Sequence, residues 1–200
     1  MSLLLEPTKL IDQLQQNLSF QNRSKAADAA VLIAITQEQN PQVILTRRAA
    51  QMRHHAGEVS FPGGRREKGD TSNIVVALRE AQEEIALNPF DVQLLGELPI
   101  QKARSGMIVK PIVGLIPPQV LLIPQPSEID RIFYMPLRTF IDSPPQAYPV
   151  RFAEHDLYFP SFHFDNEIVW GLTARIMISL LSRGLGYRKE WPFLLNAPKP

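Results

Sequence analysis

The sequence predicts an α/β fold, an α/β/α sandwich built as a single domain. Apolar, branched runs typical of strands fill the middle of the chain, while segments with helical spacing of apolar residues stand toward both ends. The chain has 200 residues, 44% of them hydrophobic, which suits one domain with an ordinary core. No internal repeat divides it further, so we expect residues 1–200 to form one unit.

The first half predicts a helix, a hairpin and a second helix. Apolar residues recur at helical spacing over residues 7–19, within a helical extension over residues 1–25: Leu10, Ile11, Leu14 and Leu18. Residues 29–36 and 43–47 are apolar, branched runs separated by "QEQNP", which predicts two strands joined as a hairpin. The pair Gly63 and Gly64 is expected to break the following segment into a loop, and "GDTSN" predicts a helix start before Ile74.

The second half predicts three strands and a closing helix. Strand-like runs cover residues 92–101, 107–116 and 132–140. The prolines of this half predict loops within the domain: Pro117, Pro118, Pro124, Pro126, Pro144 and Pro145. Residues 166–183 show helical spacing, and Gly184 is expected to end that helix.

Composition excludes several classes of protein. Twenty-one basic and 20 acidic residues leave a formal net charge of +1, so no overall charge favours nucleic acid or an anionic membrane. The chain has no cysteine, which excludes disulfides and thiolate metal sites. No apolar run approaches roughly 18 residues, and the Met-Ser-Leu-Leu-Leu start is too short for a signal peptide. We expect a cytoplasmic protein without nucleic-acid or membrane partners; the sequence leaves a homodimer open.

The stretch "LREAQEEIAL" at residues 78–87 sets three carboxylates on one predicted helix. One stripe of this helix is apolar: Ile74, Leu78, Ala81 and Ile85. Glu80, Glu83 and Glu84 gather on nearly the opposite side, where like charges repel. Since Glu80 and Glu84 are one turn apart, their oxygens can converge on a single point, and a hard divalent cation such as Mg²⁺ is the natural occupant.

An acidic, solvated helix face is the better explanation of "REAQEE" when that segment is considered alone. The upstream "FPGG" at residues 61–64 favours a cation site over a solvated face, because two glycines expose backbone groups that can approach a phosphate or a metal. The two features together indicate a site.

These residues resemble the Nudix box of the Nudix hydrolases. The matching positions are Gly64, Asp70, Arg79, Glu80, Glu83, Glu84, Ala86 and Leu87. Asp70 stands where the general pattern has glutamate, the gap to Arg79 is one residue longer, and Ala86 replaces a late glycine. A left-handed backbone at Ala86 would cost about 1 kcal/mol more than at glycine, which favours a helix that continues through it.

A second motif resembles the coenzyme A pyrophosphatase branch of this family. Residues 44–64, "ILTRRAAQMRHHAGEVSFPGG", are similar to the branch's "LLTxRxxxLRxHxGEVxFPGG", and residues 127–137 and 168–176 also resemble the family. The resemblance implies the Nudix α/β/α sandwich with a mixed sheet and added N-terminal and C-terminal helices. It also implies Mg²⁺ or Mn²⁺ and cleavage of coenzyme A to 3′,5′-ADP and 4′-phosphopantetheine.

Roles for the acidic residues follow from this resemblance and from the chemistry. Splitting a diphosphate needs an activated water and neutralised phosphoryl oxygens, which metal ions supply. Glu80 and Glu84 are the first expected ligands, Glu83 completes a multi-metal cluster or polarises the water, and the Gly64 carbonyl is a further candidate. Arg79 is expected to pair with a neighbouring carboxylate and fix its rotamer.

The general base is left open between Glu128 in the "PQPSEID" loop and Glu58, which is better placed by sequence because it stands immediately before the expected strand that ends at the glycines. The expected substrate contacts lie around the glycine motif: Arg47, Arg53, His54, Phe61, Gly63, Gly64 and Arg65. The three arginines and His54 among them belong to a local group of cations that also holds Arg48, His55 and Arg66, and arginines recognise phosphate by paired hydrogen bonds. His54 and His55 are a poor transition-metal pair, because adjacent side chains point in different directions.

Two other functions remain open. One is a pyrophosphatase for another nucleoside diphosphate derivative, such as NADH or ADP-ribose. The other is a nucleotide-binding module without turnover, for which Ala86 is the hint, although the retained charges at Arg79, Glu80, Glu83 and Glu84 argue against it.

Overall fold

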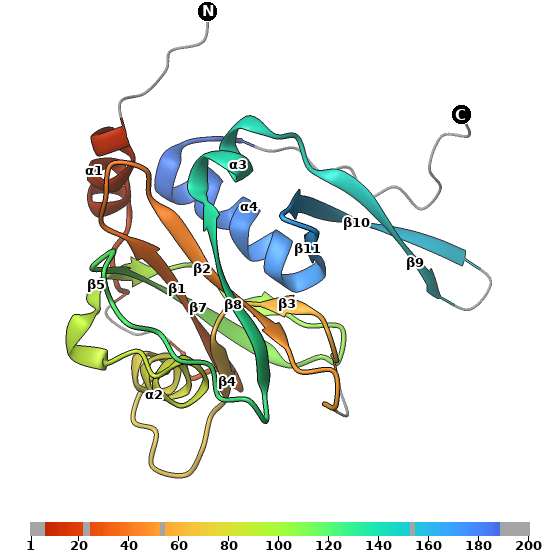
Figure 1. Ribbon diagram of the computed structural model, residues 1–200, viewed down its shortest axis with the longest axis horizontal. Helices are drawn as coiled ribbons and strands as arrows, with labels where there is room; N and C mark the ends of the chain where they lie inside the picture. Colours follow the sequence, from red (N-terminus) through yellow and green to blue (C-terminus); the bar gives the residue numbers. More distant parts are fainter. Residues whose placement is uncertain (1–6, 22–24, 53–54, 153–154, 189–200) are drawn as a thin grey trace, which may run out of the picture.

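The computed structural model describes residues 7–21, 25–52, 55–152 and 155–188. Within these ranges, an eight-stranded mixed sheet lies between helices, and a separate three-stranded sheet adjoins one side (Figure 1). The helices are α1 (Pro7–Asn17), α2 (Asn73–Ile85), α3 (Leu137–Asp142) and α4 (Gly171–Leu185), with a short 3₁₀ helix η1 (Pro89–Asp91). The predicted α/β/α sandwich with a mixed sheet is confirmed.

The strands of the large sheet are β1 (Ala29–Thr36), β2 (Gln42–Arg48), β3 (Val59–Ser60), β4 (Gly63–Arg65), β5 (Gln93–Glu97), β6 (Gln101–Lys102), β7 (Ile108–Ile116) and β8 (Ile129–Pro136). Their order is β3-β2-β1-β7-β5, with β4 on β1, β6 on β7 and β8 on β2. Strands β1 and β7 run parallel, from Ala29 opposite Val109 to Thr36 opposite Ile116, and the other pairs are antiparallel.

Strand β1 shows why helices cover both faces of this sheet. Successive side chains of a strand point to opposite faces, and β1 is apolar at almost every position. Ala30, Leu32 and Ala34 pack in the core cluster that contains α2, whereas Ile33 and Ile35 pack in the cluster that contains α1 and α4. Figure 1 shows α2 on one side of the sheet and α1 and α4 on the other. The sheet therefore carries a core on each face.

The predicted hairpin of β1 and β2 is confirmed, with Ile35 opposite Val43. The acidic helix starts where expected, since the Ser72 side chain caps α2 by accepting from the Val75 N–H. The expectation of a loop at the glycine pair is wrong, because Gly63 opens strand β4, which pairs with β1. Pairing with β1 holds this segment as a strand, and the glycines alone do not indicate that pairing.

The end of α2 differs from the sequence expectation. Helix α2 stops at Ile85, and Ala86 adopts the left-handed conformation with φ 55° and ψ 24°. Its N–H donates to the carbonyl oxygen of Gln82, and the Leu87 N–H donates to that of Ala81, so the cap bonds of the last turn form without glycine. The prediction that the helix continues through Ala86 was wrong.

The C-terminal third differs most from the prediction. Residues 137–140 belong to helix α3 rather than to a strand, and residues 167–170 form a strand before α4 begins. Gly184 lies inside α4 against Leu14 of α1, and Gly186, with φ 71°, ends the helix instead. A Cβ on Gly184 would lie 2.7 Å from a Leu14 methyl carbon, so this glycine permits close helix packing.

The three-stranded sheet was not predicted. It consists of β9 (Gln146–Phe152), β10 (His155–Phe164) and β11 (Glu167–Trp170), all antiparallel. Phe162 of β10 meets Phe140 of α3 edge to face, with ring centroids 4.9 Å apart, which joins this sheet to the main core. Among the described residues, no helix is long and apolar enough to cross a membrane.

Candidate active site

The side chain of Glu80 lies directly against the backbone of Gly64. A Cβ placed on Gly64 would come within 2.5 Å of the Glu80 carboxyl carbon, so only glycine leaves room for the carboxylate there. Strand β4 packs under α2 and presents its backbone to the helix. The sequence prediction that the glycine motif and the acidic helix form one site is consistent with this contact.

Glu84 is the second carboxylate of the site, and its side chain faces inward. It is only 3% exposed, and its two oxygens accept from the Gly63 N–H at 3.0 Å and from Arg48 Nη1 at 3.5 Å. The pKa of Glu84 is raised to about 7, mainly by burial; the Gly63 N–H and Arg48 oppose this shift, and the charges of Glu80 and Glu128 add to it. The prediction that Glu84 points away from the core was wrong, since the Gly63 N–H draws it to the sheet.

The group formed by Glu80, Glu84 and Glu128 is rich in negative charge. The pKa of Glu80 is also raised, first by burial, and then by the charges of Glu83 and Glu128, against the opposing effect of Arg79. Carboxylates that raise one another's pKa in a partly buried space are what a divalent cation would neutralise. The donor set therefore fits a hard cation, held by Glu80 and Glu84.

No group of three His, Cys, Asp or Glu side chains stands ready to hold a metal in the described ranges. A cation at Glu80 and Glu84 would thus complete its coordination with water, backbone carbonyl oxygens such as that of Gly64, or phosphate oxygens. Mg²⁺ suits such a site, because it usually keeps several waters and takes one or two protein carboxylates.

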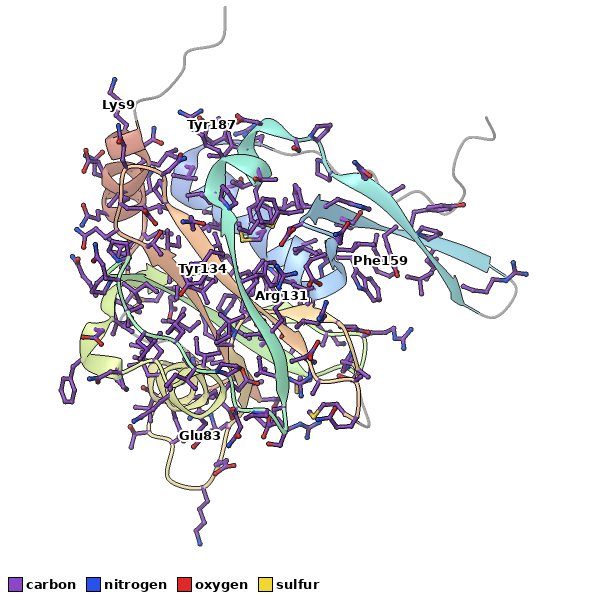
Figure 2. All side chains as sticks on the ribbon, viewed as in Figure 1. Lys9, Glu83, Arg131, Tyr134, Phe159 and Tyr187 are labelled. Carbon is purple, nitrogen blue, oxygen red and sulfur yellow. The ribbon has the colours of Figure 1, made fainter. Side chains whose placement is uncertain are left out.

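Glu83 differs from the other two glutamates of α2. Its side chain is 58% exposed, and it lies at the outer edge of the molecule (Figure 2). It accepts from Arg79 Nη1 at 2.9 Å, one turn back along the helix. A cluster of all three carboxylates around one point is therefore not present, and the role predicted for Glu83 as a direct ligand stays a prediction.

Arg79 makes the pairing that the sequence predicts. Its guanidinium donates to both oxygens of Asp70, to the Arg65 carbonyl oxygen and to Glu83, and it lies 3.0 Å from Glu80. The hydrogen bond from Arg79 lowers the pKa of Asp70, and Asp70 raises the pKa of Arg79. Asp70, which stands where the family pattern has glutamate, thus helps to hold Arg79 in place beside Glu80.

The two candidate bases lie in different surroundings. Glu128 is close enough to raise the pKa of both Glu80 and Glu84. The carboxylate of Glu58 instead lies 2.8 Å from His55 Nδ1 on an exposed loop. Glu128 is thus within electrostatic range of both candidate metal ligands, and the choice between the two bases stays a prediction.

Several predicted substrate contacts have other roles. Phe61 is 2% exposed and packs in the core cluster, so its contact with substrate stays a prediction. The Gly63 N–H is bonded to Glu84, and the guanidinium of Arg47 is bonded to Asp130 and Glu167. Arg65 is exposed beside the site, whereas Arg53 and His54 lie outside the described residues.

Arg48 is the residue that the predicted substrate set missed. It follows Arg47 on β2, and the side chains of neighbouring strand residues point to opposite faces. The motif quoted for residues 44–64 could have singled out Arg48, because its first fixed arginine aligns with Arg48 and a variable position aligns with Arg47. The contact of Arg48 with Glu84 joins it to α2.

Comparison with known proteins agrees with this geometry. The family model of the NUDIX domain matches residues 26–153. The chain therefore belongs to the NUDIX domain family, and its class is that of the Nudix hydrolases, enzymes that generally use divalent cations and act on small nucleotide derivatives.

Its similarity extends to named relatives over most of its length. It is 41% identical over 172 residues to the "Uncharacterized Nudix hydrolase NudL" of Pectobacterium atrosepticum, covering 84% of this chain and 88% of that one. It is also 41% identical over 155 residues to the protein of the same description from Photorhabdus laumondii, covering 76% and 82%.

Solved structures show lower similarity. A Nudix hydrolase from M. smegmatis, RenU, gives a TM-score of 0.48 at 17% identity, covering 62% of this chain and 81% of that one. An Ap4A hydrolase of C. elegans gives 0.49 at 16% identity, covering 57% and 83%.

Proposed function

We propose that this Nudix hydrolase cleaves the diphosphate bond of coenzyme A, and of its thioesters, with Mg²⁺ or Mn²⁺. The products are 3′,5′-ADP and 4′-phosphopantetheine, or the acylated form of the latter. The resemblance of residues 44–64 to the coenzyme A pyrophosphatase motif supports this substrate. The observation that carries the chemistry is the approach of Glu80 and Glu84 to the backbone of Gly63 and Gly64.

In this proposal the protein positions and neutralises groups around the diphosphate. Glu80 and Glu84 would hold the cation, which when bound supplies charge neutralisation and a more acidic water. Glu128 accepts the proton of the water whose oxygen attacks one phosphorus, and the bond from that phosphorus to the bridging oxygen breaks. Arg79 keeps Glu80 in the required orientation through its own bonds to Asp70 and Arg65.

A product assay tests the proposal. The protein would be incubated with coenzyme A, NADH or ADP-ribose, in Mg²⁺, Mn²⁺ or chelator, and the products separated by chromatography. We expect 3′,5′-ADP and 4′-phosphopantetheine from coenzyme A, with activity lost in chelator. Preference for NADH or ADP-ribose would remove the coenzyme A assignment and favour the second candidate, a pyrophosphatase for another nucleoside diphosphate derivative.

A binding module without turnover is the third candidate. Its only sequence hint was Ala86, and the left-handed conformation of Ala86 gives that hint a structural account, because the last turn of α2 is capped without disturbing Glu84. Binding without product in the same assay would support this candidate. The cytoplasmic location and the homodimer stay predictions from the sequence.

A further inference from the structure

Two consecutive arginines of β2 are used in different ways. Arg47 donates to Asp130 at 2.6 and 2.8 Å and to Glu167 at 2.9 Å. These short contacts with two carboxylates neutralise its charge within an ion-pair network that also contains Arg131. The side chain of Arg47 therefore links β2 to β8 and β11.

The guanidinium of Arg48 is poorly satisfied by comparison. Within the described residues, it contacts only Glu84 Oε1, at 3.5 Å, the outer limit of a hydrogen bond. A guanidinium carries five N–H donors, and this side chain is only 20% exposed, so water reaches it incompletely. Among the described residues, none of the Arg48 nitrogen atoms is a fully buried donor without a partner, so the donors that do not bond Glu84 are open to an incoming acceptor.

The backbone holds Arg48 in a defined place. Its N–H donates to the Glu58 carbonyl oxygen at 3.0 Å, and its carbonyl oxygen accepts from Gly57 at 3.1 Å. The next residue, Ala49, donates to the Glu128 carbonyl oxygen at 2.8 Å. The β2–β8 register shifts between Arg47 and Arg48, which are the two residues whose side chains have different partners. The backbone of Arg48 and Ala49 is thus hydrogen-bonded to both loops that carry the candidate bases.

The contact of Arg48 with Glu84 indicates where a further acceptor for the Arg48 guanidinium would lie. Glu84 is the carboxylate that would hold the cation, and cations in phosphoryl transfer bridge phosphate oxygens. Phosphate oxygens bound to that cation would lie near Glu84, within reach of the Arg48 guanidinium. Arginine binds such oxygens with paired, charge-assisted hydrogen bonds.

We propose that Arg48 binds the non-bridging oxygens of the substrate diphosphate, in the place that the sequence prediction gave to Arg47. The inference rests on the proposed diphosphate hydrolysis at this site, but not on coenzyme A as the substrate. A competing role is purely internal: Arg48 would only fix the rotamer of Glu84.

Binding of α,β-methylene-ADP, a diphosphate that resists cleavage between its phosphorus atoms, tests the proposal by calorimetry in saturating Mg²⁺. Arg48→Gln should weaken binding by about 10- to 100-fold, the loss expected for hydrogen bonds to a charged group. Arg48→Lys should recover part of the affinity, because it restores the charge without the paired geometry. Arg131→Gln is the matched control, since it removes an arginine from the Arg47 network, and it should bind the probe as the unmutated protein does.

Two results would overturn the proposal. One is unchanged probe affinity in folded Arg48→Gln. The other is a loss of Mg²⁺ affinity measured without nucleotide, together with full probe affinity at saturating Mg²⁺, because that pattern belongs to a residue that only orients Glu84. The probe contains no pantetheine, so failure of the coenzyme A assignment would leave this test intact. Failure of the unmutated protein to bind the probe would remove the diphosphate site itself.

Discussion

Two of the buried carboxylates in the described residues, Glu167 and Glu84, have different partners. Glu167 of β11 is 5% exposed and accepts from Arg47 at 2.9 Å and Arg131 at 3.0 Å. Glu84 of α2 is 3% exposed, yet its nearest guanidinium is 3.5 Å away. A buried carboxylate with two close arginines is a structural joint, whereas one with acidic neighbours and a distant arginine is suited to an added cation.

Glu84→Gln is expected to give the largest effect in this comparison. The substitution keeps the shape of the side chain and the bond from Gly63 but removes the charge that would hold the cation. We expect kcat to fall on the order of 10³-fold at saturating Mg²⁺, with folding intact by circular dichroism. Near-full activity would contradict the ligand role of Glu84.

Glu128→Gln comes next and is compared with Glu58→Gln. A general base contributes roughly 10²- to 10⁴-fold, so we expect Glu128→Gln to lower kcat by about 10²-fold. Glu58 is paired with His55 on an exposed loop, and its loss should change kcat far less. Steady-state kinetics of both variants decide the matter, and the reverse order of effects would transfer the role of base to Glu58.

The comparison also shows what the sequence could and could not supply. The charged positions of α2 and the glycines of β4 were found because local motifs carry them, and Ser72 and the β1–β2 hairpin follow from local turn and capping chemistry. The inward turn of Glu84 was missed, since helical periodicity does not include the Gly63 N–H that draws it to the sheet.

The structural joint at Glu167 could not be predicted for a similar reason. Arg47 and Glu167 are 120 residues apart, and the segment around Glu167 reads as the start of a helix by periodicity alone. Pairing with β10 turns residues 167–170 into a strand. Contacts between distant segments override local preference here.

Stability should depend on pH in a way that reports on the candidate site. The pKa of Glu84 rises from 4.5 to about 7 in the folded, cation-free protein. At Glu84 the folded state then binds more protons than the unfolded state between these values, so the contribution of Glu84 to stability is fully present below about pH 4.5 and is lost as pH rises to about 7. We expect the Tm in chelator to drop by a few degrees across this window.

Two controls isolate this dependence. Glu84→Gln should flatten the fall in Tm, because it removes the titrating group that faces Arg48, Glu80 and Glu128. Mg²⁺ should raise the Tm more at pH 8 than at pH 5, since the cation binds the ionised carboxylate. Equal stabilisation by Mg²⁺ at both pH values would contradict a cation at Glu84.

Glu167→Gln should give the smallest effect on activity. The substitution leaves Arg47 and Arg131 without one carboxylate, although Asp130 and Asp165 still pair with them, so a loss of about 1 kcal/mol in unfolding free energy is expected. Because the network contacts none of Glu80, Glu84 or Arg48 in the described residues, KM and kcat should stay at their unmutated values. A clear rise in KM for the substrate, with Tm unchanged, would mean that the Arg47 network serves the site after all and that the two buried carboxylates are not separate in function.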